Sequence, residues 1–90
     1  MSPMPLFAVT IRITATPDQA ESALQAQVEA LRELDRAGRI RLAGRLEQDE
    51  GFLAVFVAKD LLDARKTAAG FPLIRDGLAS WTLRAYQDLK

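Results

Sequence analysis

The fold is decided by residues 37–58, AGRIRLAGRLEQDEGFLAVFVA, which have the pattern of two strands joined by a short acidic turn. The second half of this stretch, residues 52–58 (FLAVFVA), is apolar at odd and even positions alike. Because successive side chains of a strand point to opposite faces of a sheet, both faces of this strand must be covered. A chain of 90 residues with two predicted helices can cover one face. We therefore expect a second copy of the protein to cover the other face.

The first half of the chain predicts a strand followed by a long helix. Residues 6–14 alternate between apolar and polar side chains, as a strand does. Residues 16–19 (TPDQ) supply a hydroxyl for the N-cap, a proline at the first helical position and a glutamine three residues after the cap. These signals predict a helix over residues 17–37, and Gly38 can take the left-handed conformation that ends it.

The second half predicts three strands and a shorter helix. Residues 40–45 and residues 79–87 alternate as strands do, Asp60 caps a helix over residues 61–69, and residues 71–77 are expected to be a connecting segment. With right-handed crossovers, this order gives a ferredoxin-like βαββαβ fold of the α+β class. It has a four-stranded antiparallel sheet with two helices on one face. The first and third strands are expected to be central and the other two to be edges.

Composition limits the classes of function. Lysine plus arginine and aspartate plus glutamate both number 12, so no basic excess points to nucleic acid or to an acidic membrane surface. The absence of histidine and cysteine removes imidazole bases, thiol nucleophiles, disulfides and the usual zinc ligands, and we expect no metal or cofactor. The longest apolar run, residues 52–58, is far shorter than the ~20 residues of a membrane helix. One cytoplasmic domain, residues 1–90, is expected.

The sheet face turned away from the helices carries the candidate ligand-binding residues. The side expected to pack on the helices contains Phe7, Val9, Ile11, Ile13, Ile40, Leu42, Trp81, Leu83 and Ala85. The opposite side is expected to contain Thr10, Arg12, Arg41, Arg45, Thr82, Arg84 and Tyr86. If two such sheets pair face to face, the guanidinium groups can hold a carboxylate or a phenolate in a cleft. Alternatively, the arginines are edge charges that deter aggregation, solvated or paired with acids.

Other charged and apolar side chains are interpreted structurally. Asp18, Asp60 and Asp63 are expected to be helix caps or first-turn charges rather than a catalytic acid and base. Glu29 and Arg32 are spaced to pair on the surface of the long helix. The inner edge of the shorter helix is expected to consist of Leu61, Leu62, Ala64, Arg65 and Ala68.

The run LRELDRAGRIRLAGRLEQDEGFLAVFVAKDLLDARKTAAGFPLIRDGL resembles the YciI-like (YCII-related) proteins. In that family a helix leads into a Gly-Arg turn, an AGP-like segment, an acidic hairpin loop, an apolar strand, a helix of the form xxxEAR, a DPF or DPY motif and a closing GL. The likeness covers about residues 27–86. It implies a dimeric α+β barrel, and hence a homodimer or a higher homo-oligomer.

The resemblance also implies a possible site made of a helix histidine and the aspartate of the DP motif. In this chain the histidine position falls on Gln27 and the aspartate position on Phe71, while Arg45 replaces the proline of the AGP segment. A histidine-dependent activity is therefore not expected to carry over. The chain is also similar to muconolactone isomerase, whose FP-type segment before the last strand is matched loosely by residues 71–73 (FPL).

Three hypotheses from different classes follow. The first is a YciI-like protein that binds a small anionic or aromatic metabolite in a dimer cleft and is an enzyme only if a carboxylate or an arginine replaces the missing histidine and aspartate. The second is a muconolactone-isomerase-like enzyme of aromatic degradation. The third is a structural dimer without small-molecule chemistry.

Overall fold

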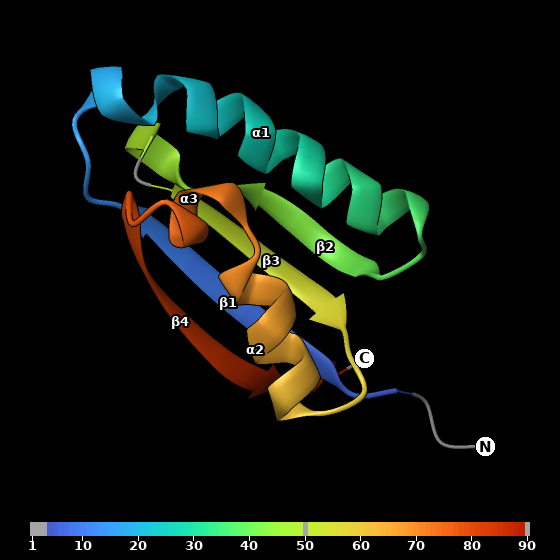
Figure 1. The fold of residues 1–90 in the computed structure, drawn as a ribbon. Coiled ribbons are helices and arrows are strands. Elements are labelled where there is room, and N and C mark those ends of the chain that lie inside the picture. The colour runs from blue at the N-terminus through green and yellow to red at the C-terminus, as the bar shows by residue number, and fades with distance from the viewer. Residues whose placement is uncertain (1–3, 50, 90) are drawn as a thin grey trace.

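The computed structural model describes residues 4–49 and 51–89, so Glu50 of the predicted acidic turn lies outside the described residues. Figure 1 shows the elements, which follow the order β1 (Leu6–Ile13), α1 (Pro17–Arg36), β2 (Ile40–Arg45), the 3-10 turn η1 (Glu47–Asp49), β3 (Gly51–Val57), α2 (Leu61–Ala69), α3 (Pro72–Arg75) and β4 (Ala79–Tyr86). The four strands form one antiparallel sheet in the order β2-β3-β1-β4. The predicted βαββαβ fold is confirmed.

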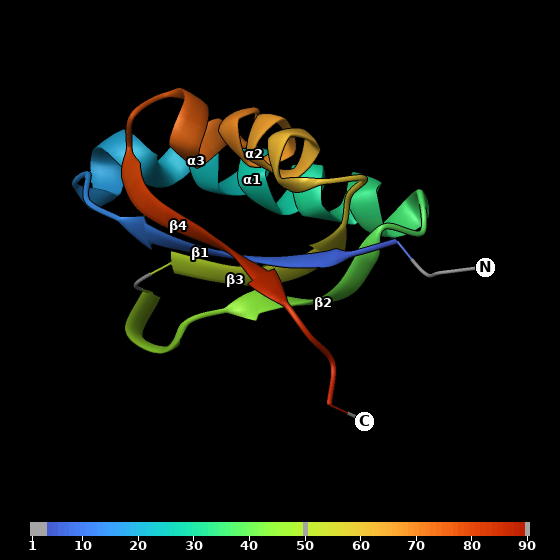
Figure 2. The ribbon, with the colours of Figure 1, turned by 90° about the horizontal axis from the view of Figure 1, so that it is seen from below.

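All three helices lie on one side of the sheet, and Figure 2 shows the opposite side without a covering layer. The short helix α3 corrects the expectation that residues 71–77 only connect α2 to β4. Pro72 starts this helix because its fixed φ angle suits the first helical position. No helix in the described ranges is long and apolar enough to cross a membrane.

The capping residues of α1 act as their sequence pattern predicts. The side chain of Thr16 accepts a hydrogen bond from the backbone N–H of Gln19, and the side chain of Gln19 accepts one from the backbone N–H of Thr16. Gly38 ends the segment at φ 76°. The predicted pair of Glu29 with Arg32 is wrong, because Glu29 instead accepts from Arg36, two helical turns further along.

The core lies between the helices and the covered face of the sheet. Side chains of β1 and β3 alternate into it, and cross-strand register pairs Phe7 with Phe56 and Ile11 with Phe52. Only glycine fits at position 51, the first residue of β3. A Cβ atom there would lie 1.7 Å from the carbonyl oxygen of Ile11 in β1. The φ angle of Gly51, 154°, is also one that residues with side chains rarely adopt.

A β-bulge in β2 reverses the predicted faces of the residues that follow it, whereas Ile40 lies on the helix side as predicted. The register shifts between Ile40 and Leu42, so that Leu42 pairs with Val55 and Arg45 pairs with Phe52. An extra residue at a bulge reverses the alternation of every side chain that follows it. Leu42 therefore lies on the uncovered face, not on the helices, and Arg45 lies on the helix side, not on the uncovered face.

The inner edge of α2 is narrower than predicted. Ala64 and Ala68 are fully buried, whereas Leu61 and Leu62 are 48% and 62% exposed and Arg65 is also exposed. Two alanines four residues apart form the inward stripe, and their small side chains bring the helix backbone close to the sheet. The first turn of α2 consequently stays at the surface.

Candidate functional site: the open face of the sheet

The candidate site is the uncovered side of the sheet, here called the open face. Cross-strand register assigns to it Leu6, Ala8, Thr10, Arg12, Leu42, Gly44, Leu53, Val55, Val57, Ser80, Thr82, Arg84 and Tyr86. Paired residues in neighbouring strands share one side of a sheet, which fixes this membership. All four strands therefore contribute side chains to the open face.

The polarity of the open face changes from one edge of the sheet to the other. Neighbouring strands align two rows, namely Arg84, Ala8, Val55 and Leu42, and Thr82, Thr10, Leu53 and Gly44. Guanidinium and hydroxyl groups thus lie towards β4, and apolar side chains lie towards β2. Val55, at the centre, is 1% exposed even though no helix covers it. The open face therefore has an apolar half near β2 and a polar half near β4.

The C-terminal tail reaches the opposite edge of the sheet. Nε and Nη2 of Arg41 donate to one carboxylate oxygen of Asp88 at 2.9 and 2.6 Å. β4 and β2 are the two edges of the sheet and lie about 14 Å apart at the usual strand spacing. The ion pair therefore connects the segment that follows β4 to the opposite edge strand. Figure 2 shows the tail leaving β4 on the side away from the helices. Arg41 is thereby held at the border of the open face.

The structure places the other predicted ligand-binding residues as follows. Thr10 and Thr82 are cross-strand partners, and Arg84 and Tyr86 lie on the same side of β4. Arg12 is aligned with Ser80 at the other end of the face. Arg45 is separated from this group, because its guanidinium carbon lies 5.4 Å from the centre of the Phe52 ring on the helix side.

The two positions of the implied histidine and aspartate lie in the interior. Gln27 is fully buried, and its Oε1 accepts a hydrogen bond from the backbone N–H of Leu73 at 3.3 Å. Its Nε2 is buried without a hydrogen-bond partner among the described residues. Phe71, 3% exposed, packs its ring edge-on against Phe56. Gln27 thus links α1 to α3, and Phe71 packs the start of α3 against β3.

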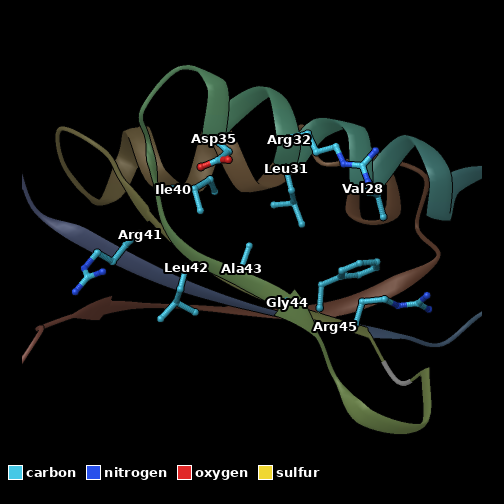
Figure 3. A pocket seen from close by; sticks show the side chains of 11 residues that line it. Val28, Leu31, Arg32, Asp35, Ile40, Arg41, Leu42, Ala43, Gly44 and Arg45 are labelled. Atoms are coloured by element: carbon cyan, nitrogen blue, oxygen red, sulfur yellow. The ribbon is translucent and has the colours of Figure 1, made fainter.

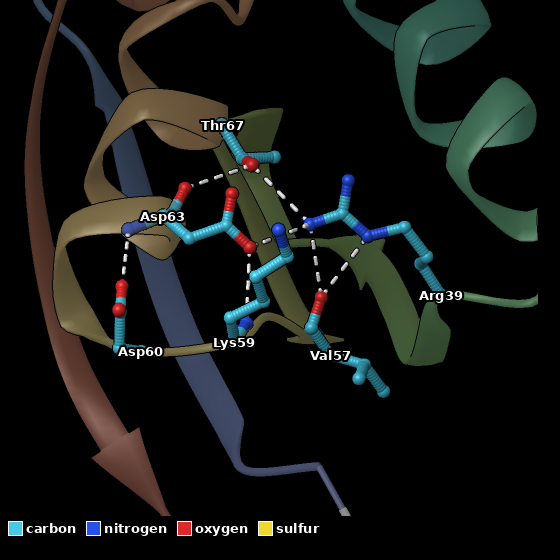
Figure 4. Close-up of polar contacts among 6 residues, drawn as sticks. All are labelled: Arg39, Val57, Lys59, Asp60, Asp63 and Thr67. Atoms are coloured by element: carbon cyan, nitrogen blue, oxygen red, sulfur yellow. Dashed lines mark hydrogen bonds and ion pairs between the residues drawn. The ribbon is translucent and has the colours of Figure 1, made fainter.

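The carboxylates near α2 belong to a structural network rather than to the open face. Asp60 accepts from the backbone N–H of Asp63, and Asp63 accepts from the backbone N–H of Lys59, as Figure 4 shows. Arg39 donates twice to the carbonyl of Val57 and once to Thr67 Oγ1, which joins the start of β2 to α2. Within the described ranges, no cluster of three His, Cys, Asp or Glu residues could hold a metal ion.

Leu42 and Ser80 are among the members of the open face that sequence reasoning missed. Leu42 adds an apolar side chain that is 43% exposed, and Ser80 adds a hydroxyl beside Arg12. Ser80 follows from the alternation of β4, which carries its partners Thr82 and Arg84 on the same side. Leu42 had no local signal, because the bulge depends on how β2 pairs with β3.

No protein-family model matches the chain, and no curated protein matches it. Solved structures do match its fold. The 5-chloro-2-hydroxyhydroquinone dehydrochlorinase from Burkholderia phenoliruptrix AC1100, solved with 2,5-dihydroxybenzoquinone, has a TM-score of 0.77 at 13% identity over 91% of this chain and 93% of that one. A muconolactone isomerase has a TM-score of 0.71 at 19% identity over 90% and 86%. A cofactor-independent oxygenase from Streptomyces nogalater has a TM-score of 0.55 at 14% identity over 99% and 96%. These likenesses show that the chain shares its fold with these proteins.

Proposed function

We propose that the protein forms a homodimer through its open face and binds a small anionic or aromatic molecule in the cleft between the two sheets. The observation that carries this proposal is the polarity of the open face, with hydroxyls and a guanidinium towards β4 and an apolar floor towards β2. Each polar group that is buried in such an interface must find a partner, and a polar ligand in the cleft would supply one.

The exposed apolar side chains support pairing with a second copy. Leu42 and Tyr86 are 43% and 37% exposed near opposite edges of the open face. Large apolar surfaces on one face of a small domain mark interaction sites. A chain of 90 residues also buries only part of its apolar surface by itself, so association adds stability.

The ligand chemistry follows from the two rows. Arg84 can hold a carboxylate or phenolate with two parallel hydrogen bonds, and the Thr10 and Thr82 hydroxyls can donate beside it. The half-buried Ala8 and the 43% exposed Leu42 offer apolar surface for a ring. Two copies of the face would enclose the ligand and lower the dielectric around its charge, which strengthens the contact.

Within this fold, we assign the chain to the YciI-like proteins, as a member without the histidine and aspartate pair. The order of elements supports this assignment. An enzyme of aromatic degradation similar to muconolactone isomerase is the second candidate. The similarity in fold to that isomerase and to the dehydrochlorinase favours it.

Light scattering and thermal shifts with aromatic carboxylates test the binding proposal. We expect the mass of a dimer at micromolar concentration, and a Tm that rises by roughly 10–20 °C at a ligand concentration about 100-fold above Kd. Arg84→Ala and Thr82→Val should abolish or reduce this rise. Arg65→Ala, on the exposed side of α2, is the matched control and should leave it unchanged.

Three outcomes separate the candidates. A monomer without any ligand-dependent shift would disprove the proposed cleft. A stable dimer that responds to none of the ligands would favour a structural role. Turnover of muconolactone by the purified protein, lost in Arg84→Ala, would favour the isomerase.

A further inference from the structure

The C-terminal tail that follows β4, residues 87–89, brings a carboxylate to the open face. The tail has no regular structure and leaves β4 on the side of the sheet away from the helices, as Figure 2 shows. Leu89 is 90% exposed, so its apolar side chain is not packed on the protein. The side chain of Asp88 is only 28% exposed, and its carboxylate contacts Arg41 on the opposite edge strand. Asp88 is thus the least exposed residue of the tail.

The β-bulge places Arg41 at the border of the open face. Arg41 lies between Ile40 and Leu42, where the register of β2 shifts. In Figure 3 the side chains of Arg41 and Leu42 extend away from α1, whereas Ile40 extends towards it. Arg41 and Leu42 also line a hollow of about 480 Å³ along β2, a volume typical of sites for small molecules. A ligand carboxylate on Arg41 would therefore have an apolar contact beside it.

Asp88 shows how Arg41 binds a carboxylate. Nε and Nη2 of Arg41 donate to the same carboxylate oxygen, at 2.9 and 2.6 Å. The carboxylate of a small molecule is the same chemical group and can accept the same two hydrogen bonds. Two carboxylates cannot occupy this edge of the guanidinium at once. A ligand carboxylate that binds there must displace the tail.

The tail can be displaced at a small cost and still selects among ligands. The Arg41 side chain is 45% exposed, and exposed ion pairs of this kind typically change an equilibrium constant less than about fivefold. Because the tail belongs to the same chain, its carboxylate competes at an effective concentration on the order of millimolar. Acetate has no apolar body and competes poorly below that concentration. An aromatic carboxylate also buries apolar surface on Leu42, which favours it over the tail.

We propose that Arg41 is the carboxylate anchor of the open face, and that Asp88 occupies it as an internal competitor until an aromatic carboxylate displaces the tail. This inference rests on the proposed function. Arg84, at the other edge, then receives a second polar group of the ligand. The two edges lie about 14 Å apart, so a rigid ligand that contacts both arginines needs length, as two fused rings provide. The ligand class is a flat ring system with a carboxylate at one end and a hydroxyl at the other.

Calorimetric titration of the full chain with 6-hydroxy-2-naphthoate tests this proposal. We expect Asp88→Asn to lower the dissociation constant roughly two- to fivefold, the range that an exposed ion pair accounts for. Arg41→Ala should raise it roughly tenfold or more, because two charge-assisted hydrogen bonds are lost. In the double variant the gain from Asp88→Asn should disappear. Asp76→Asn removes the acid of another exposed ion pair, so it is the matched control and should bind as the unmodified protein does.

NMR of the ¹⁵N-labelled protein follows the tail directly. Saturation with 6-hydroxy-2-naphthoate should move the amide signals of residues 87–89 towards random-coil positions, whereas 2-naphthol, which lacks the carboxylate, should leave them in place. Tail signals that stay in place while residues 6–12 and 80–86 shift would overturn the inference and leave the proposed function intact. Equal dissociation constants for Asp88→Asn and the unmodified protein would have the same meaning. An absence of binding to both proteins would overturn the inference and the proposed function together.

Discussion

The two faces of the sheet differ in how far their side chains are buried within the single chain. On the covered face, Val9, Ile11 and Phe56 are fully buried beneath the helices. On the open face, Leu42 and Tyr86 remain substantially exposed, and polar side chains alternate with apolar ones. The covered face buries most of the core of the single chain, whereas the open face keeps exposed side chains that are available for a partner or a ligand. Substitutions on the two faces should therefore change different measured quantities.

The largest effect is expected on the covered face. Phe56→Ala should lower the free energy of unfolding by about 3–5 kcal/mol, because it leaves a cavity that the packed core cannot fill. Urea denaturation followed by circular dichroism measures this loss. Tyr86→Ala on the open face is the matched variant and should cost the isolated chain under about 1 kcal/mol. An equal loss of unfolding free energy in the two variants would show that both faces stabilise the single chain to the same extent.

A buried charge between α1 and α3 should cost almost as much, in a pH-dependent way. In Gln27→Glu, burial should raise the pKa of the new carboxyl above its unfolded value of about 4.3. Below that value the protonated group can still accept from the Leu73 amide. As pH rises towards the folded-state pKa, stability falls by about 1.4 kcal/mol per unit, reaching a loss of about 3–4 kcal/mol by pH 7.

Urea titrations of Gln27→Glu at pH 4.5 and pH 7 measure this difference. Gln27→Met, which fills a similar volume without a charge, is the control and should show no added pH dependence. Identical stability of the Glu variant at both pH values would mean that position 27 is open to water.

Association should respond to a charge on the open face but not to one on the helices. Leu42→Asp should weaken the dimer by about 2–3 kcal/mol, because pairing of the sheets would desolvate the carboxylate. Leu62→Asp places the same charge on α2, where the side chain is 62% exposed, and should leave association unchanged. Sedimentation equilibrium measures both constants. An unchanged dimer in Leu42→Asp would place the interface elsewhere.

The smallest effect is expected from the tail. Arg41 and Asp88 form an exposed ion pair across the open face, so Arg41→Ala should cost about 0–1 kcal/mol of stability. A double-mutant cycle with Asp88→Asn isolates the coupling energy of the pair. The coupling should shrink in 1 M salt, where the screening length is about 3 Å. A coupling above about 2 kcal/mol would show that the tail is buried in the protein in solution.

Much of the fold could be predicted because its signals are local. The capping box of Thr16 and Gln19, the cap at Asp60 and the alternation of β1 and β4 each arise within a few residues. Candidate residues on those two strands could likewise be assigned to the open face. Their alternation is unbroken, so one buried neighbour fixes the side of every other residue.

The amino-acid sequence by itself therefore determined the order of the four strands and the two longer helices, the ends of those helices and the apolar character of β3, but not the short helix α3. Only the tertiary structure decided on which side Arg45 and Leu42 lie, and that Gln27 contacts Leu73, 46 residues away. The physical reason is that periodicity and capping act over one or two turns of chain. A bulge and a buried contact between helices instead depend on the register and packing of segments that meet only after folding.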